Sequence, residues 1–243
     1  SIAIIPFKNK GDDKDMFYAY GISADLIKDC SGAGLIRVES LDRIEKIENY
    51  DELDITELAS KLLVRYVATG TLWKMGEIFQ LSIELYDIKS SKVIWSDRWQ
   101  EDWGNLPTIK SNLSDGLLQA LDTTSKVGKE IETTSAEAYE YYLRGKHKYE
   151  KRENLKDIEI ARSLLQKAID HDSNLILAKI SLGDTYFSIG DNKKAMDIYT
   201  SALQQAEELG DKRGIGYSLN NIGIIYRIKG DYDNALDYYE RSL

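Results

Sequence analysis

The sequence of 243 residues is poor in the residues that build disulfides, thiolate metal sites and histidine-based catalytic centres. It holds one cysteine, Cys30, so no intrachain disulfide and no thiolate metal cluster can form. The two histidines, His147 and His171, stand far apart and in no metal-ligand spacing. We therefore predict a non-enzymatic segment without catalytic residues, cofactor or metal ion, and the lone cysteine favours a reducing, cytoplasmic setting.

Long hydrophobic runs and positive charge are also scarce. The longest apolar run, residues 2–7, includes Pro6 and is far shorter than the about 20 residues that cross a bilayer, which excludes direct membrane insertion by this segment. The 41 acidic and 32 basic residues give a net charge of −9, which repels phosphate backbones, so we expect no nucleic-acid partner. A periplasmic location stays open if the parent protein has a membrane span.

What is present points to two differently built halves. Hydrophobic residues make up 42% of the chain, enough to bury a core. All four tryptophans precede residue 130, whereas most tyrosines follow it. Such a shift in composition predicts two domains.

Hydrophobic periodicity in the first half predicts an α/β domain. Residues 2–7 form a nearly continuous apolar run, which is typical of a strand buried on both faces. Residues 79–85 alternate between apolar and polar, which is typical of a strand with one buried face. The order β-α-β-α-α-β-β-β-α indicates a mixed sheet covered by helices. The expected elements are a strand at 2–7, a polar loop at 8–15, a helix at 17–30, a strand at 35–38, helices at 41–47 and 55–63, strands at 65–75, 78–88 and 92–101, and a helix at 106–121.

The second half is helical throughout and repeats itself. Ala161 recurs as Ala195 after 34 residues, and Gly183 recurs as Gly223 after 40, because the third unit has extra residues around 206–214. A period of about 34 residues, with small residues at fixed offsets, is typical of stacked helix-turn-helix units, in which small side chains let paired helices approach closely.

On these residues, the second half resembles tetratricopeptide (TPR) repeats. Gly145 and Ala161 are farther apart in sequence than Gly183 and Ala195, which predicts a longer turn at 150–157 in the first unit. The last unit stops within its second helix, so we expect further repeats to follow. The three units span 136–173, 174–211 and 212–243.

The TPR resemblance implies a protein-binding or peptide-binding groove on the concave face, lined by the first helix of each unit. Aromatic residues with few charges at its centre suit a bound peptide, although the same residues can instead pack against a neighbouring repeat or the first domain. An uncovered last unit would also favour pairing with a second copy. By register with the glycines, the protein-binding candidates are Tyr139, Tyr142, Lys146, Tyr149, Ile180, Asp184, Phe187, Tyr217, Asn220, Ile224 and Arg227.

Residues 1–125 resemble the TolB-like amino-terminal domain that precedes TPR arrays in bacterial class III adenylate/guanylate cyclases. The motifs that carry this resemblance lie at 2–7, 21–27, 35–38, 63–70 and 93–98. The resemblance implies a regulatory segment of a larger signalling protein, with a helical connector at 126–135 between the two domains. The segment itself would act as a scaffold, whereas the full-length parent would hold the cyclase.

Two other functions stay open. The loops at 8–15 and 39–43 follow the parallel strands, where α/β folds often bind small ligands, so the first domain could be a ligand sensor. An oligomerisation module is the other alternative. The acidic cluster Asp12, Asp13 and Asp15 is most simply a solvated loop, and Trp95 with Trp99 is most simply part of the core.

Overall fold

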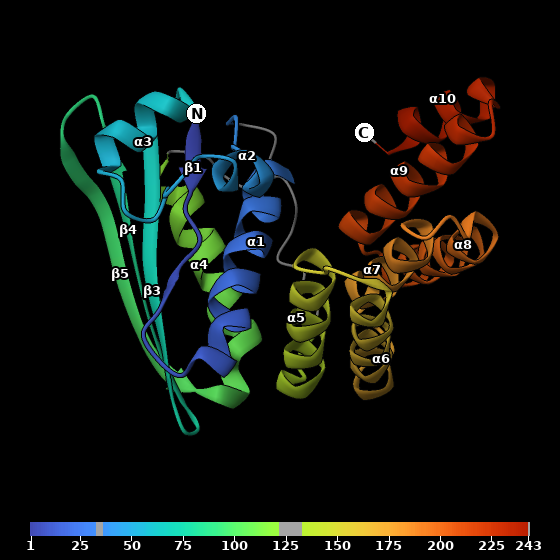
Figure 1. The fold of residues 1–243 in the computed structure, drawn as a ribbon, viewed down its shortest axis with the longest axis horizontal. Helices are drawn as coiled ribbons and strands as arrows, with labels where there is room; N and C mark the ends of the chain where they lie inside the picture. Colours follow the sequence, from blue (N-terminus) through green and yellow to red (C-terminus); the bar gives the residue numbers. More distant parts are fainter. Residues whose placement is uncertain (33–35, 122–132, 243) are drawn as a thin grey trace. The chain divides into compact units, whose positions relative to one another are not determined.

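The computed structural model describes residues 1–32, 36–121 and 133–242. The chain divides into two compact units, Ser1–Lys129 and Glu130–Leu243, drawn from blue to green and from yellow to red in Figure 1. The predicted fold class, an α/β domain followed by a helical repeat region, is confirmed. The predicted helical connector at 126–135 lies largely outside the described residues, and its described end, 133–135, is not helical.

The first unit follows the predicted order with two differences. The polar loop after the first strand contains two further short elements, β2 and η1, and the strand expected at 35–38 is reduced, among the described residues, to a single parallel bridge between Ile2 and Val38. The elements are β1 (Ile2–Ile4), β2 (Lys8–Asn9), η1 (Asp13–Asp15), α1 (Met16–Gly32), α2 (Leu41–Glu45), α3 (Ile55–Leu62), β3 (Tyr66–Met75), β4 (Ile78–Asp87), β5 (Lys92–Asp102), η2 (Trp103–Asn105) and α4 (Leu106–Ala120).

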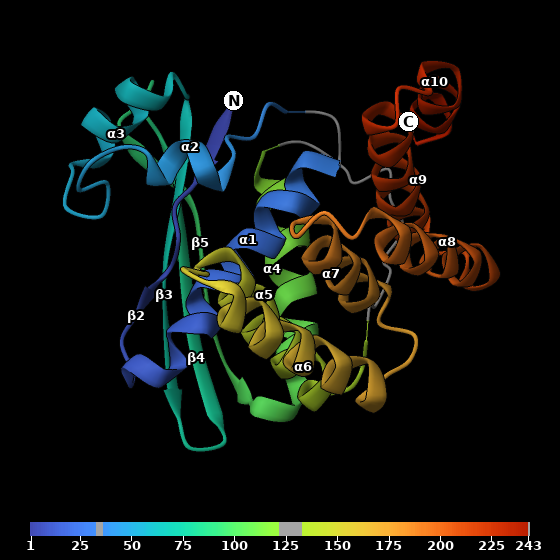
Figure 2. The same ribbon diagram turned by 45° about the vertical axis from the view of Figure 1, so that its right-hand side comes forward.

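The strands of this unit form one mixed sheet. Its order is β1-β3-β4-β5, and β2 also pairs with β3. β1 and β2 run parallel to β3, whereas β3, β4 and β5 form an antiparallel meander. Figure 2 shows the three long strands side by side. The mixed sheet predicted from periodicity is therefore present.

The core of the first unit lies between the sheet and the pair α1 and α4, which cover the same face (Figure 1). A Cβ on Gly116 of α4 would lie 2.6 Å from Cζ2 of Trp95 in β5, so this helix can approach the strand only because residue 116 has no side chain. The half-buried Trp95 thus packs against α4. The apolar residues of β4 on this face are each at most 1% exposed, namely Phe79, Leu81, Ile83 and Leu85.

The second unit consists of three helix pairs, and each helix contacts the next one along the chain. The helices are α5 (Ala136–Glu150), α6 (Leu155–His171), α7 (Ile176–Phe187), α8 (Asn192–Leu209), α9 (Lys212–Ile228) and α10 (Tyr232–Arg241). These boundaries place one helix pair in each of the three predicted units.

Close approach within each pair depends on a glycine. A Cβ on Gly183 would lie 2.4 Å from Cε1 of Tyr199, and a Cβ on Gly223 would lie 2.8 Å from Cε1 of Tyr239. Both distances are shorter than a van der Waals contact, so an aromatic ring of the second helix occupies the space that a side chain would need. This is the physical reason for the repeated glycine.

The turns of the second and third pairs are built alike. Gly190 and Gly230 have φ of 82° and 80°, the left-handed region that favours glycine. The following Asp191 and Asp231 cap α8 and α10 by accepting a hydrogen bond from a backbone N–H of the first turn. Each turn thus ends one helix with a glycine and starts the next with an aspartate cap.

The longer turn predicted for the first pair is wrong. Residues 151–154 join α5 to α6, and residues 188–191 join α7 to α8, so the two links are equally long. The extra spacing between Gly145 and Ala161 instead lengthens the two helices. Sequence spacing alone does not distinguish these cases, since a longer turn and an added helical turn displace the motif equally.

Candidate functional site

The first helices of the three pairs, α5, α7 and α9, lie next to one another, and Asp184 of α7 joins them. Its carboxylate oxygen Oδ1 accepts hydrogen bonds from the Tyr199 hydroxyl at 2.6 Å and from Nδ2 of Asn221 at 3.1 Å. Its backbone carbonyl accepts from the Tyr149 hydroxyl at 3.1 Å. One residue therefore links α5, α7, α8 and α9.

This network changes how the tyrosine behaves. Tyr199 is 2% exposed, and burial, followed by the Asp184 carboxylate, raises its pKa far above the ordinary value. The phenol therefore stays protonated and donates to Asp184 at every physiological pH. The candidate Asp184 is thus already engaged as an acceptor inside the array.

The predicted binding residues differ in exposure. The exposed ones lie on α9, whereas the buried ones lie mainly on α5. The buried residues are Tyr139, Tyr142, Lys146 and Ile180; the half-buried residues are Tyr149, Asp184, Phe187, Tyr217 and Ile224; the exposed residues are Asn220 and Arg227.

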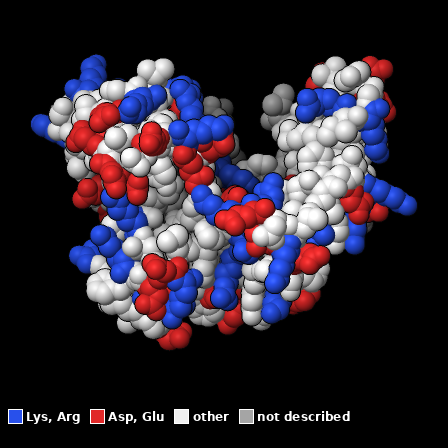
Figure 3. All heavy atoms as spheres, viewed as in Figure 1, with Lys and Arg blue, Asp and Glu red and all other residues white. Residues whose placement is uncertain are grey.

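On α9 the candidates form one stripe, because Tyr217, Asn220, Ile224 and Arg227 follow one another at helical spacing. The stripe offers an aromatic ring, an amide, an aliphatic side chain and a guanidinium group. Where α9 faces the viewer in Figure 3, most atoms belong to uncharged residues. Acidic and basic side chains are mixed over the rest of the visible surface of the molecule. Such a surface can bind a peptide, and it pairs no nucleophile with a base.

Sequence reasoning missed two polar contacts of the array. Asn221, one residue beyond the predicted Asn220, bonds to Asp184. Arg162 of α6 donates to the side chain and the carbonyl of Thr185 in α7 at 3.0 and 2.9 Å. The period of the repeat identifies small residues but not such partners, because they come from different helices.

In the first unit, ion pairs lie in both of the loops predicted for a small ligand. Glu39 is 4% exposed, and its carboxylate lies 3.0 Å from Arg37 and 3.1 Å from Arg43. Asp12 of the acidic cluster pairs with Lys14 at 2.9 Å. Within the described residues, no group of three or more His, Cys, Asp or Glu side chains is placed to hold a metal ion.

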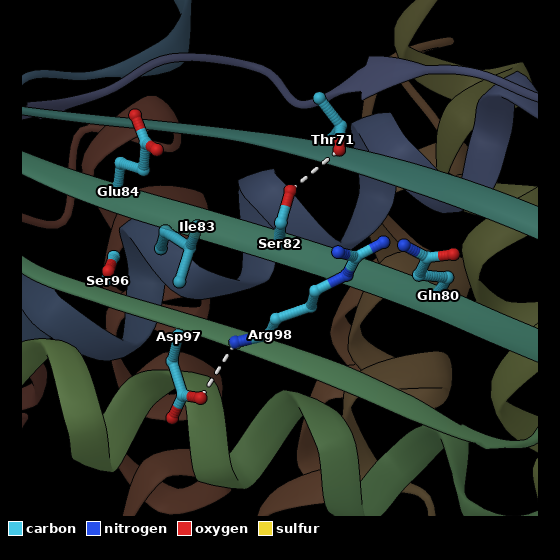
Figure 4. Close-up of a pocket in the computed structure, with 8 residues that line it drawn as sticks. All are labelled: Thr71, Gln80, Ser82, Ile83, Glu84, Ser96, Asp97 and Arg98. Atoms are coloured by element: carbon cyan, nitrogen blue, oxygen red, sulfur yellow. Dashed lines mark hydrogen bonds between the residues drawn. The ribbon is translucent and has the colours of Figure 1, made fainter.

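Two hollows of the first unit were not predicted. A cavity of about 360 Å³ lies among Lys8, the segment 50–58 and strands β3 and β4. The adjoining hollow of about 610 Å³ lies on the sheet (Figure 4), where the Thr71 and Ser82 hydroxyls are 2.7 Å apart. Figure 4 shows the Arg98 and Gln80 side chains next to each other. Alternation in 79–85 places Gln80 and Ser82 on the face opposite the buried one but gives no sign of a hollow there.

No helix in the described ranges has both the length and the apolar character needed to cross a bilayer.

Two family models match the chain. Residues 174–243 match the tetratricopeptide repeat model, which confirms the repeats predicted there. Residues 1–120 match the model described as HilA/YgeH-like transcriptional regulator, second domain. The predicted nucleotide cyclase context is not among these findings and stays a prediction.

Similar proteins cover parts of the chain. The photosystem I assembly protein Ycf3 of Acaryochloris marina is 44% identical over 54 residues, which are 22% of this chain and 31% of that protein. Its counterpart from Rippkaea orientalis is 41% identical over 54 residues, 22% of this chain and 30% of that protein. The chain thus spans about a third of the length of these relatives.

Among solved structures, TolB from Acinetobacter baumannii is similar with a TM-score of 0.37 at 19% identity, over 49% of this chain and 27% of that one. MamA is similar with a TM-score of 0.36 at 22% identity, over 56% of this chain and 67% of that one.

Proposed function

We propose that this chain is a non-catalytic regulatory and scaffolding segment that binds a protein or peptide on the face formed by α5, α7 and α9. The observation that carries the proposal is the α9 stripe of Tyr217, Asn220, Ile224 and Arg227, which leaves an amide and a guanidinium group exposed beside half-buried apolar groups. Bound peptides need this combination, because apolar contacts supply affinity while polar contacts fix the register.

The comparisons support this proposal in two ways. TPR arrays bind proteins through surfaces made of stacked repeats. The match of residues 1–120 to a domain of transcriptional regulators supports a regulatory role for the parent protein. We retain a nucleotide cyclase as the proposed effector of that parent, on the TolB-like resemblance.

The test is a quantitative pull-down with the intact chain as bait, in which wild type is compared with Tyr217→Ala and Arg227→Glu. We expect both variants to lose the same partner, since both remove parts of one stripe. Lys156→Glu on α6 is the control, because Lys156 is exposed on a second helix of the array. Unchanged far-ultraviolet circular dichroism must show that each variant folds.

Retention of every captured protein by both variants would contradict the proposal. Equal loss with Lys156→Glu would also contradict it, because net charge rather than the α9 stripe would then control capture.

The second candidate function is a small-ligand sensor in the first unit. The specific observation in its favour is the cavity of about 360 Å³ beside Lys8, which lies within the about 300–1,000 Å³ usual for ligand sites. A thermal-shift screen of the intact chain with a metabolite panel tests it. A hit should weaken in Lys8→Ala and persist in Lys14→Ala, and a panel without hits would reject the sensor function for the compounds used.

Self-association and location are further parts of the proposal. The exposed Tyr232 and Leu236 of α10, 69% and 57% accessible, support a homodimer, which light scattering over a range of concentrations would test. A strict monomer at high concentration would reject it. We place the segment in the cytoplasm, and fractionation of cells that express the intact protein tests this.

A further inference from the structure

A groove separate from the α5, α7 and α9 face lies among α6, α7 and α8, and we name it the α6–α8 groove. Its volume is about 410 Å³. Three half-buried aliphatic side chains line it, one from each helix: Ile169, Leu182 and Ile198. Half-buried aliphatic groups from three helices offer apolar area that a bound side chain can remove from water.

Charged side chains surround these aliphatic groups. Lys179 of α7 and Lys194 of α8 line the groove together with one acid, Asp197. Neither lysine forms an ion pair within the described part of the chain. Both ammonium groups therefore remain available to a carboxylate supplied by a partner.

The two lysines instead meet neutral groups. The Lys179 ammonium contacts the side-chain oxygen of Gln205, and that of Lys194 lies 4.3 Å from the centre of the Tyr186 ring. Partial burial lowers the pKa of Lys179, which means that its charge is not fully compensated where it lies. A carboxylate brought to this position would compensate it.

Positive charge continues beyond the groove. The Arg162 guanidinium of α6 lies 3.8 Å from the centre of the same Tyr186 ring that Lys194 contacts. Cations from α6 and α8 thus converge on one ring of α7. The lining itself has two positive groups and one negative group, and Arg162 lies beside it.

We propose that the α6–α8 groove binds an acidic amphipathic peptide segment of a partner protein. Its apolar side chains pack on Ile169, Leu182 and Ile198, and its carboxylates pair with Lys179 and Lys194. An apolar strip lined by two lysines and one acid matches a helix with apolar residues at i, i+3, i+4 and i+7 and acidic flanks. This site shares no residue with the candidates on α5, α7 and α9.

The test uses a designed peptide made of Leu and Glu in that helical pattern and labelled with fluorescein, long enough to form several helical turns. Anisotropy titration with the intact chain should show saturable binding. A scrambled peptide of identical composition should bind at least about tenfold more weakly, a difference of about 1.4 kcal/mol, because its apolar side chains no longer share a face.

Three variants locate the site. The double variant Lys179→Glu with Lys194→Glu, and the single variant Ile198→Asp, should each weaken binding at least about tenfold. Lys193→Glu is the matched control, because Lys193 is exposed on α8 but does not line the groove. It should change the affinity less than about twofold. Circular dichroism and thermal unfolding confirm that the variants fold.

Several outcomes overturn the inference. They are no binding of the peptide, equal binding of the scrambled peptide, or an equal loss with Lys193→Glu, which would indicate general charge attraction. Loss of binding in Tyr217→Ala but not in the lysine double variant would move the peptide to the α9 stripe. That result would reject the groove and leave the proposed function standing.

Discussion

The two units reach stability in different ways. In the α/β unit, neighbours in space are far apart in sequence, as where Ile2 of β1 pairs with Tyr66 of β3. In the helical unit, neighbours are close in sequence, as where Gly183 faces Tyr199. A sheet built from distant segments forms one cooperative core, whereas stacked helix pairs add their stabilities locally. Damage should therefore spread through the first unit and stay local in the second.

The largest expected effect is that of Leu85→Ala in β4. Leu85 is fully buried between Ala68 of β3 and Trp95 of β5, so its truncation should lower the free energy of unfolding by about 2–5 kcal/mol. Tryptophan fluorescence in urea reports this change, because all four tryptophans lie in the first unit.

If Leu85→Ala shifts the urea transition in far-ultraviolet circular dichroism as much as the transition in tryptophan fluorescence, the two units unfold as one. The contrast between them would then be wrong. Val93→Ala in β5 is the control, because the Val93 side chain is 48% exposed. It should shift the urea midpoint of tryptophan fluorescence little.

An intermediate effect is expected for Gly183→Ala. The new methyl group would meet the Tyr199 ring, and the hydrogen bond to Asp184 holds that ring in place. We therefore expect the free energy of unfolding to fall by about 1–3 kcal/mol. Gly216→Ala is the matched control, since its methyl group would only touch a backbone oxygen of Ser242 at 3.4 Å. Gly216→Ala should raise the free energy of unfolding by up to about 1 kcal/mol, because alanine has the higher helix propensity.

Both glycine variants are followed by far-ultraviolet circular dichroism in urea, while tryptophan fluorescence should stay unchanged. Equal effects of Gly183→Ala and Gly216→Ala would show that the close approach to Tyr199 is not needed.

The smallest effect concerns pH and the first unit alone. Arg65 bonds to both Asp87 oxygens at 2.9 and 3.1 Å and lowers the pKa of Asp87 from 3.8 to about 2, with help from the backbone N–H of Lys89. Because the folded pKa is depressed, this stabilisation is complete above the unfolded value and is lost as pH falls through about 2.

Asp87→Asn should therefore lower the urea midpoint of tryptophan fluorescence at pH 7 and reduce its fall between pH 4 and 2. Asp102→Asn at the exposed end of β5 is the control. If Asp87→Asn lowers the urea midpoint relative to wild type by as much at pH 2 as at pH 7, the proposed role of this ion pair is refuted.

The sequence predicted the elements better than their partners. Alternation in 79–85 and the regular recurrence of small residues in the second half locate strands and helix pairs, because each pattern reflects one local geometry. The strand expected at 35–38 has only the bridge at Val38, since its neighbours depend on the whole sheet. The turn at 150–157 was misjudged because spacing does not separate helix from loop.

The candidate site was less predictable for the same reason. Register placed Tyr142 and Arg227 on equivalent helices, yet the first is buried and the second exposed. Exposure depends on what covers a helix, and periodicity carries no information about that. The α6–α8 groove had no sequence signal, because Ile169, Leu182 and Ile198 come from three helices.

Asp184 has one more consequence, for the mechanics of the array. Its Oδ1 accepts from Tyr199 within its own pair and from Asn221 in the next, so one atom joins two helix pairs. A ligand that pulls Asn221 outward must lengthen a bond to the same carboxylate that holds Tyr199. A displacement of Asn221 in the third helix pair therefore weakens a contact of the same carboxylate that fixes Tyr199 in the second.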